Sequence, residues 1–158
     1  ELFKLKTNKM ETKFRAWVTV NGDEKEMVYN WCFLNPENNN FYGVDTTNER
    51  PDIGDVLAVM RFINKKDINN EELYTGDIVR WGMLENSLEP LIRYAVIETN
   101  PDIQFRILFY VNPKTNERVE TKGKVFDYGS FAYQATELYL EKVGDIHTTP
   151  ELLTEKTK

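Results

Sequence analysis

Residues 13–34, KFRAWVTVNGDEKEMVYNWCFL, contain two strand-like runs on either side of an Asn-Gly pair. In the first run every second residue is apolar: Phe14, Ala16, Val18 and Val20. A period of two is typical of a strand that buries one of its faces. Asn21 and Gly22 both tolerate a positive φ, so they favour a tight hairpin turn. The stretch therefore predicts an opening β-hairpin over residues 12–34.

Seven further segments have the composition of strands and are separated by residues that favour turns. They are residues 41–42, 56–63, 77–81, 91–98, 103–111, 124–127 and 137–143. The run VLAVMRFI at 56–63 is apolar enough for a central strand. Asn69-Asn70 and Pro101-Asp102 supply turn signals between neighbouring runs. Short strands at this spacing predict an all-β, mainly antiparallel sandwich or small barrel.

Helix signals are confined to two places near the C-terminal end of the sequence. Residues 130–138, SFAYQATEL, suit one or two helical turns. In Thr149-Pro150-Glu151, the Thr can cap a helix, the Pro suits its first position and the Glu complements its dipole. We predict a short C-terminal helix there, with Leu152 and Leu153 packed against the domain.

The composition limits the classes of function. The net charge is −6, and a duplex DNA-binding protein needs a dense basic surface. The single cysteine, Cys32, cannot form an internal disulfide, which suits a reducing cytoplasm. Residues 1–10 lack the apolar segment of a secretory signal. Aromatic residues make up 13% of the chain and suit both strands and contact surfaces.

The usual catalytic and cofactor motifs are missing from the sequence. One cysteine and one histidine, His147, cannot supply the ligands of a zinc site. Neither a P-loop nor a dinucleotide-binding glycine motif occurs. Cys32 lies in an apolar strand-like run, where a thiol is most often a core residue. We predict no catalytic residue, no metal site and no cofactor.

Asp77 in ELYTGDIVRW is the one carboxylate that invites a catalytic interpretation. Gly-Asp occurs three times beside strand-like runs, at Gly54-Asp55, Gly76-Asp77 and Gly144-Asp145. Glycine supplies the dihedral angles of a tight bend, and Asp accepts hydrogen bonds from nearby backbone amides. A catalytic Asp requires a second titratable group, which the sequence does not identify. We predict a turn at Asp77, and keep a carboxylate-metal hydrolase as a remote alternative.

Basic and aromatic residues occur together twice, as in proteins that stack single-stranded nucleic acid. The alternative nucleic-acid face would consist of Lys13, Arg15, Trp17, Arg80 and Trp81. The acidic balance of the chain disfavours this alternative.

Three blocks occur in an order typical of one family: KFRAW at 13–17, MRFINKKDINNEELYTGDIVRW at 60–81 and LEKVGDIHTTPELL at 140–153. In these blocks the sequence resembles the YopX family of bacteriophage and prophage proteins. The resemblance implies an all-β fold of two lobes and an origin in a mobile element, and it transfers no catalytic motif. The ELYTGDIV segment also resembles the start of a small SH3-like barrel.

These observations predict two lobes and a binding function. We expect a flexible tail at 1–10, an N-terminal β lobe at 11–63, a C-terminal SH3-like β lobe with the terminal helix at 64–153, and a tail at 154–158. The expected function is that of a non-enzymatic phage accessory protein in the cytoplasm of the bacterial host, which binds an unknown protein partner, forms homo-oligomers and does not engage a membrane. The predicted contact surface comprises Trp17, Tyr74, Trp81 and Tyr110.

Overall fold

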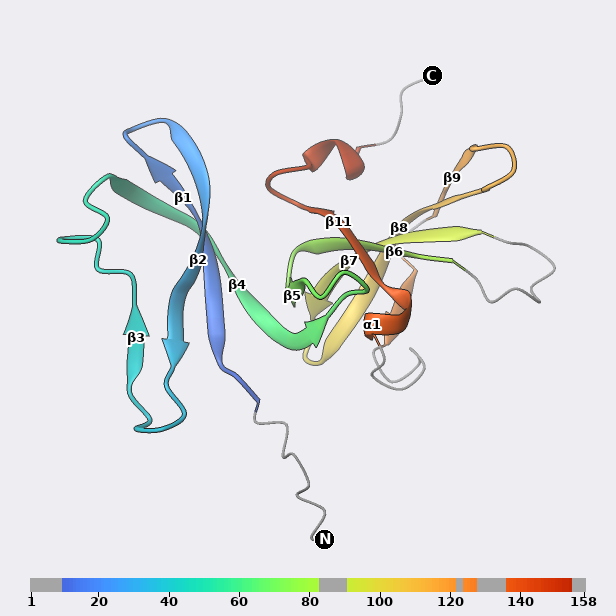
Figure 1. The fold of residues 1–158 in the computed structure, drawn as a ribbon. Coiled ribbons are helices and arrows are strands. Elements are labelled where there is room, and N and C mark those ends of the chain that lie inside the picture. Colours follow the sequence, from blue (N-terminus) through green and yellow to red (C-terminus); the bar gives the residue numbers. More distant parts are fainter. Residues whose placement is uncertain (1–9, 83–90, 122–123, 128–135, 155–158) are drawn as a thin grey trace, which may run out of the picture. The chain divides into compact units, whose positions relative to one another are not determined.

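The computed structural model describes residues 10–82, 91–121, 124–127 and 136–154, and it consists mostly of antiparallel strands (Figure 1). The chain forms two compact units, residues 1–64 and 65–158. The mainly antiparallel all-β fold expected from the period of two is confirmed.

The first unit is built on an antiparallel sheet in the order β3-β2-β1-β4, with the short β5 following β4. Its strands are β1 (Lys13–Val20), β2 (Glu24–Leu34), β3 (Phe41–Gly43) and β4 (Ile53–Lys66). Asn21 and Gly22 have φ angles of 48° and 99°, so the predicted Asn-Gly hairpin is present. Leu34 closes the hairpin by donating its amide to the carbonyl of Thr12 at 2.8 Å.

The core of the first unit follows the alternation of β1. Ala16, Val18 and Val20 are at most 5% exposed and pack with Val28 of β2. Partly buried Trp31, Val44 and Ile53 complete this cluster. The pairing with β2 shifts register between Phe14 and Ala16, where β2 carries extra residues between Val28 and Cys32.

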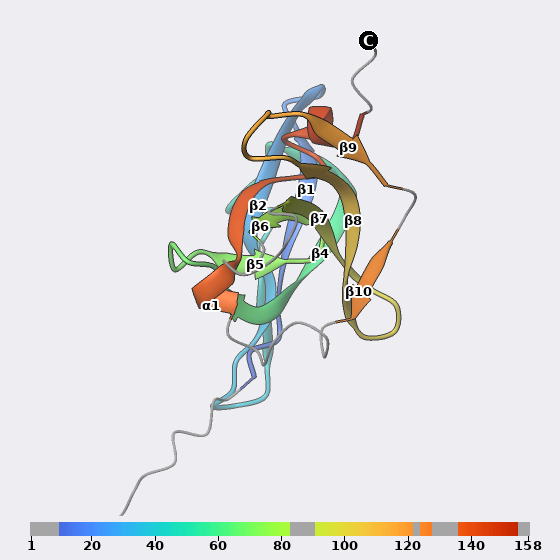
Figure 2. The same cartoon turned by 90° about the vertical axis from the view of Figure 1, so that its right-hand side faces the viewer.

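The second unit contains a sheet in the order β10-β8-β7-β6-β11. The strands of this sheet are β6 (Asp77–Trp81), β7 (Ile92–Thr99), β8 (Ile103–Val111), β9 (Arg118–Glu120), β10 (Val125–Asp127) and β11 (Glu141–Asp145). By sequence β5 (Glu72–Tyr74) also falls in this unit, but it is a strand of the first sheet. The first part of β8 pairs with β10 and its last part with β9 (Figure 2). Ile97, Phe105, Ile107 and Leu140 are at most 1% exposed and belong to its core. The SH3-like form expected of this lobe stays a prediction.

The structure corrects several element assignments. The strand predicted at 137–143 is divided into a short helix, α1 (Thr136–Tyr139), and β11. The division falls at Leu140, whose side chain is fully buried and whose carbonyl accepts the amide of Ile68 at 2.8 Å. The strands β5 and β9, of three residues each, were not predicted. Most of the helix predicted at 130–138 lies outside the described residues.

The predicted C-terminal helix is only a single 3₁₀ turn over Pro150–Leu152. Thr149 makes no side-chain capping bond, because its hydroxyl is engaged with the backbone of Asp145. No residue of the turn is buried, and Leu153 is 39% exposed, so the expected packing of the two leucines is not seen.

Candidate functional site

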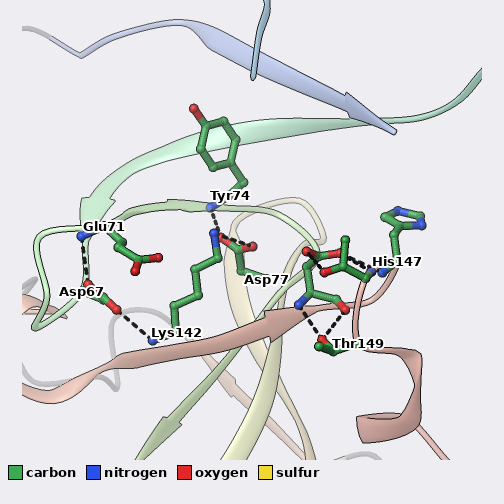
Figure 3. A network of polar contacts seen from close by, with 9 residues as sticks. Asp67, Glu71, Tyr74, Asp77, Lys142, His147 and Thr149 are labelled. Carbon is green, nitrogen blue, oxygen red and sulfur yellow. Dashed lines mark hydrogen bonds and ion pairs between the residues drawn. The ribbon is translucent and has the colours of Figure 1, made fainter. Parts of the chain in front are cut away.

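Three buried aspartates form the centre of a polar network in the second unit (Figure 3). Asp67 follows β4, Asp77 begins β6 and Asp145 ends β11. Their exposed fractions are 1%, 0% and 6%. Because a buried carboxylate is costly unless it is paired and hydrogen-bonded, the partners of these three side chains reveal their role.

Asp77 is held in a bend that its neighbours define. Gly76 has a φ of 85°, a conformation that glycine adopts without strain. Its amide donates to the carbonyl of Ile97 at 2.8 Å. Oδ2 of Asp77 accepts the backbone amide of Tyr74 at 2.7 Å, and Oδ1 lies 3.5 Å from Nζ of Lys142. The Gly-Asp pair therefore closes the turn between β5 and β6.

Asp67 joins two segments that are 75 residues apart in the sequence. Its Oδ1 accepts the amides of Asn69 and Glu71, at 2.8 and 2.9 Å, and so shapes the turn between β4 and β5. Asn70 has the positive φ, 63°, that this turn requires. Oδ2 of Asp67 accepts the amide of Lys142 on β11 at 2.9 Å.

Asp145 organises the turn after β11. Its Oδ1 accepts the amides of His147 and Thr148, and its Oδ2 accepts the hydroxyl of Thr148. The hydroxyl of Thr149 accepts the amide of Asp145 at 2.9 Å and donates to its carbonyl at 2.8 Å. His147 thus enters the network through its backbone, as the donor to a carboxylate.

All three carboxylates accept backbone amides, which is the arrangement of side chains that shape turns. They present almost no surface to a substrate. Within the described residues, no group of three or more His, Cys, Asp or Glu side chains is placed to hold a metal ion. This network orders the loops of the second unit, and that role accounts for the repeated Gly-Asp pairs at Gly76 and Gly144.

The four aromatic residues predicted for a contact surface lie in different environments. Tyr74 is 1% exposed and Trp81 is 8% exposed. Trp81 packs edge-on against Phe105, with ring centroids 5.9 Å apart, and so contributes to the core of the second unit. Trp17 and Tyr110 are partly exposed, on β1 and β8. Only these last two remain candidates for a contact surface.

The basic residues of the alternative nucleic-acid face are engaged within the chain. Nζ of Lys13 lies 4.4 Å from the ring centroid of Phe62, and Arg15 is fully buried. Arg80 donates to Glu141 at 2.7 Å, and this hydrogen bond raises the pKa of the Arg80 guanidinium. Lys13, Arg15 and Trp17 belong to the first unit, and Arg80 and Trp81 to the second. The five residues of this alternative face are thus divided between the two units.

The first unit exposes large apolar side chains that the sequence interpretation missed. They are Tyr29 at 49%, Phe41 at 63%, Tyr42 at 45%, Val56 at 46%, Leu57 at 47% and Val59 at 53%. Phe41 and Tyr42 lie on β3, an edge strand, and the three aliphatic residues lie on β4. A signal was available in the run of apolar residues at 56–60, which has no period of two. The sequence analysis instead assigned this apolar run to a central strand.

The strand β4 is central only at its end. The strand β5 has only three residues and follows the turn after Lys66. As the hairpin partner of β4, it is therefore long enough to pair only with the last residues of that strand. From Ile53 to Arg61, the paired neighbour of β4 in the described part of the chain is β1. The outer side of this segment is a sheet edge.

The fold and these surfaces define a two-unit, mainly antiparallel β protein. The YopX protein family matches residues 13–154, and the chain belongs to this family. The resemblance seen in the three sequence blocks is thereby confirmed. A search of curated proteins found no relative. Among the helices of the described residues, none has the length and apolar character needed to cross a bilayer.

Proposed function

We propose that the chain is a phage- or prophage-encoded accessory protein that acts in the cytoplasm of its bacterial host as a non-enzymatic protein-interaction module. It binds a protein partner through the first unit and also associates with itself. The observation that carries this proposal is the group of six large apolar side chains, from Tyr29 to Val59, that the first unit leaves 45–63% exposed.

Exposed apolar side chains of this size favour protein contacts. Tyr and Phe are enriched at interfaces, where they supply a large contact area at a low cost in conformational entropy. Phe33 supports Tyr42 by stacking, with ring centroids 5.8 Å apart, and Asn38 donates to the hydroxyl of Tyr42 at 3.0 Å. The ring of Tyr42 is therefore held in place before a partner arrives, which reduces the cost of binding.

The non-enzymatic part of the proposal rests on the use of the buried carboxylates. A general acid or base must reach the proton that it transfers. Asp67, Asp77 and Asp145 instead direct their oxygens to backbone amides of their own turns. This supports a structural role for the residues that otherwise invite a catalytic interpretation.

The test is capture of partners from host lysate by the tagged full chain, with half of the sample treated with nuclease. We expect a retained protein in both halves, and its loss with a Phe41→Ser/Tyr42→Ser variant. Leu138→Ser is the control, because Leu138 is also an exposed apolar residue, at 68%, but lies in the second unit. Recovery that disappears after nuclease treatment would contradict the proposal and support the nucleic-acid alternative.

A further inference from the structure

The outer side of β4 between Asp55 and Arg61, here called the β4 edge, has the sequence DVLAVMR. Val56, Leu57 and Val59 are each about half exposed there. Exposed apolar edge strands are templates for pairing with another strand, and natural proteins usually block them with charges or proline. Between its two ends the β4 edge contains neither.

The two charges of the β4 edge lie at its opposite ends. Asp55 and Arg61 are both exposed, and Ala58 lies midway between them. When two copies of such a strand pair in antiparallel orientation, the acidic end of each lies opposite the basic end of the other. The β4 edge is therefore complementary to itself in charge.

We propose that a second copy of this chain pairs with the β4 edge in an antiparallel arrangement, with a two-fold axis beside Ala58. Asp55 then lies opposite Arg61 of the second copy, and the symmetry repeats this pair. Leu57 lies opposite Val59 of the second copy, also twice. The inference rests on the proposed function, since it specifies where the self-association occurs.

The charge order of the β4 edge favours a second copy over an unrelated strand. A two-fold contact requires a surface that is complementary to itself, and the charge order of the β4 edge meets this requirement. The pairing of β4 with β1 also shifts register between Val56 and Ala58, which places a bulge at Leu57. The bulges of the two paired copies then lie symmetrically about the axis, each opposite Val59 of the other copy.

The backbone of Asp55 is positioned independently of its side chain. Its amide donates to the hydroxyl of Thr19 at 2.8 Å. Replacement of the carboxylate therefore leaves the anchoring of this end of β4 intact. This makes Asp55→Arg a suitable variant for a charge-reversal test, with Arg61→Asp as its counterpart.

The test measures the oligomeric state of the full chain by sedimentation equilibrium at low salt. We expect wild-type dimers, and a dissociation constant about tenfold or more higher for Asp55→Arg or Arg61→Asp alone, because each reversal places like charges together twice. An equimolar mixture of the two variants restores the dimer, since all four charges then meet opposite charges. The double variant restores it as well.

The outcomes separate this inference from the proposed function. If the wild-type chain forms dimers that neither variant weakens, pairing at the β4 edge is wrong. Self-association would then occur through another surface. Dimers weakened by both variants but not restored by mixing would also overturn this pairing, because the charges would then act without facing each other. A wild-type chain that stays monomeric at high concentration would overturn the self-association itself, while the lysate capture would still test the protein partner.

Discussion

The carboxylate of Asp77, fully buried, accepts the backbone amide of Tyr74 at 2.7 Å. The acceptor follows the donor by three positions in the sequence, so the side chain closes the turn that leads into β6. The same carboxylate lies 3.5 Å from Nζ of Lys142, whose side chain is 13% exposed. One buried group thus holds a local turn and a contact with β11.

Removal of this carboxylate destabilises the second unit. Asp77→Ala leaves the amide of Tyr74 and the ammonium of Lys142 without this partner, and we expect a loss of about 3–5 kcal/mol in the free energy of unfolding. Asp77→Asn keeps an acceptor oxygen and loses the charge, so the expected loss is about 1–3 kcal/mol. Urea denaturation measures both. An Asp77→Asn variant that keeps its stability but loses a Mg²⁺- or Mn²⁺-dependent hydrolytic activity would instead support the metal hydrolase.

Gly144 has no room for a side chain. An ideal Cβ atom at this position would lie 2.0 Å from Oγ1 of Thr149, which is fixed by two hydrogen bonds to Asp145. We expect Gly144→Ala to cost about 1–3 kcal/mol in the free energy of unfolding. A double-mutant cycle provides the control, because Gly144→Ala should cost less in a Thr149→Ala background. Equal costs in the two backgrounds would contradict the clash.

The loop before β4 responds to acid through Asp45. Hydrogen bonds from the amide of Thr47, and then from Asn48, lower the pKa of the Asp45 carboxyl. Since the pKa in the folded state is below the unfolded value of about 3.9, the stabilisation is present above that pH and is lost as the pH falls through the folded pKa.

Thermal unfolding at several pH values tests this linkage. We expect the wild-type chain to be more stable than Asp45→Asn at pH 7, with a difference that narrows below pH 4. The difference should be constant between pH 6 and 8, where the carboxylate stays ionised. A difference that is independent of pH down to pH 2 would show that the charge of Asp45 is unimportant.

Arg50 fastens the same loop to β2. Its guanidinium donates to Asp52 through Nε and Nη2, both at 2.9 Å, and to Glu26 through Nη1 and Nη2, at 3.3 and 3.0 Å. Only a planar fork of donors can satisfy two carboxylates in this way. We expect Arg50→Lys to increase amide hydrogen exchange in residues 44–52 and to leave β6–β8 unchanged. Unchanged hydrogen exchange in residues 44–52 would mean that the backbone hydrogen bonds of the loop keep it ordered without Arg50.

The local elements of the fold are readable from the sequence because their causes are local. The alternation of Ala16, Val18 and Val20 is set by the geometry of a strand, in which side chains point to opposite faces. The turns at Asn21-Gly22 and Gly76-Asp77 follow from residues that accept a positive φ or a carboxylate bond. The order of three sequence blocks was likewise enough to indicate the YopX family.

Only the tertiary structure determined which of these residues are buried and which strands lie at a sheet edge. Tyr74 and Trp81 are residue types that suit a contact surface, yet they are only 1% and 8% exposed. Trp81 packs against Phe105 of another strand. Asp67 finds the amide of Lys142 75 residues further on, which no local pattern can predict. The apolar run at 56–60 has the composition of a central strand, but most of β4 lies at an edge. Hydrophobic periods and turn propensities depend on residues that are neighbours in the sequence. Burial and edge position depend instead on which strands pair, and strands that pair can be far apart in the sequence.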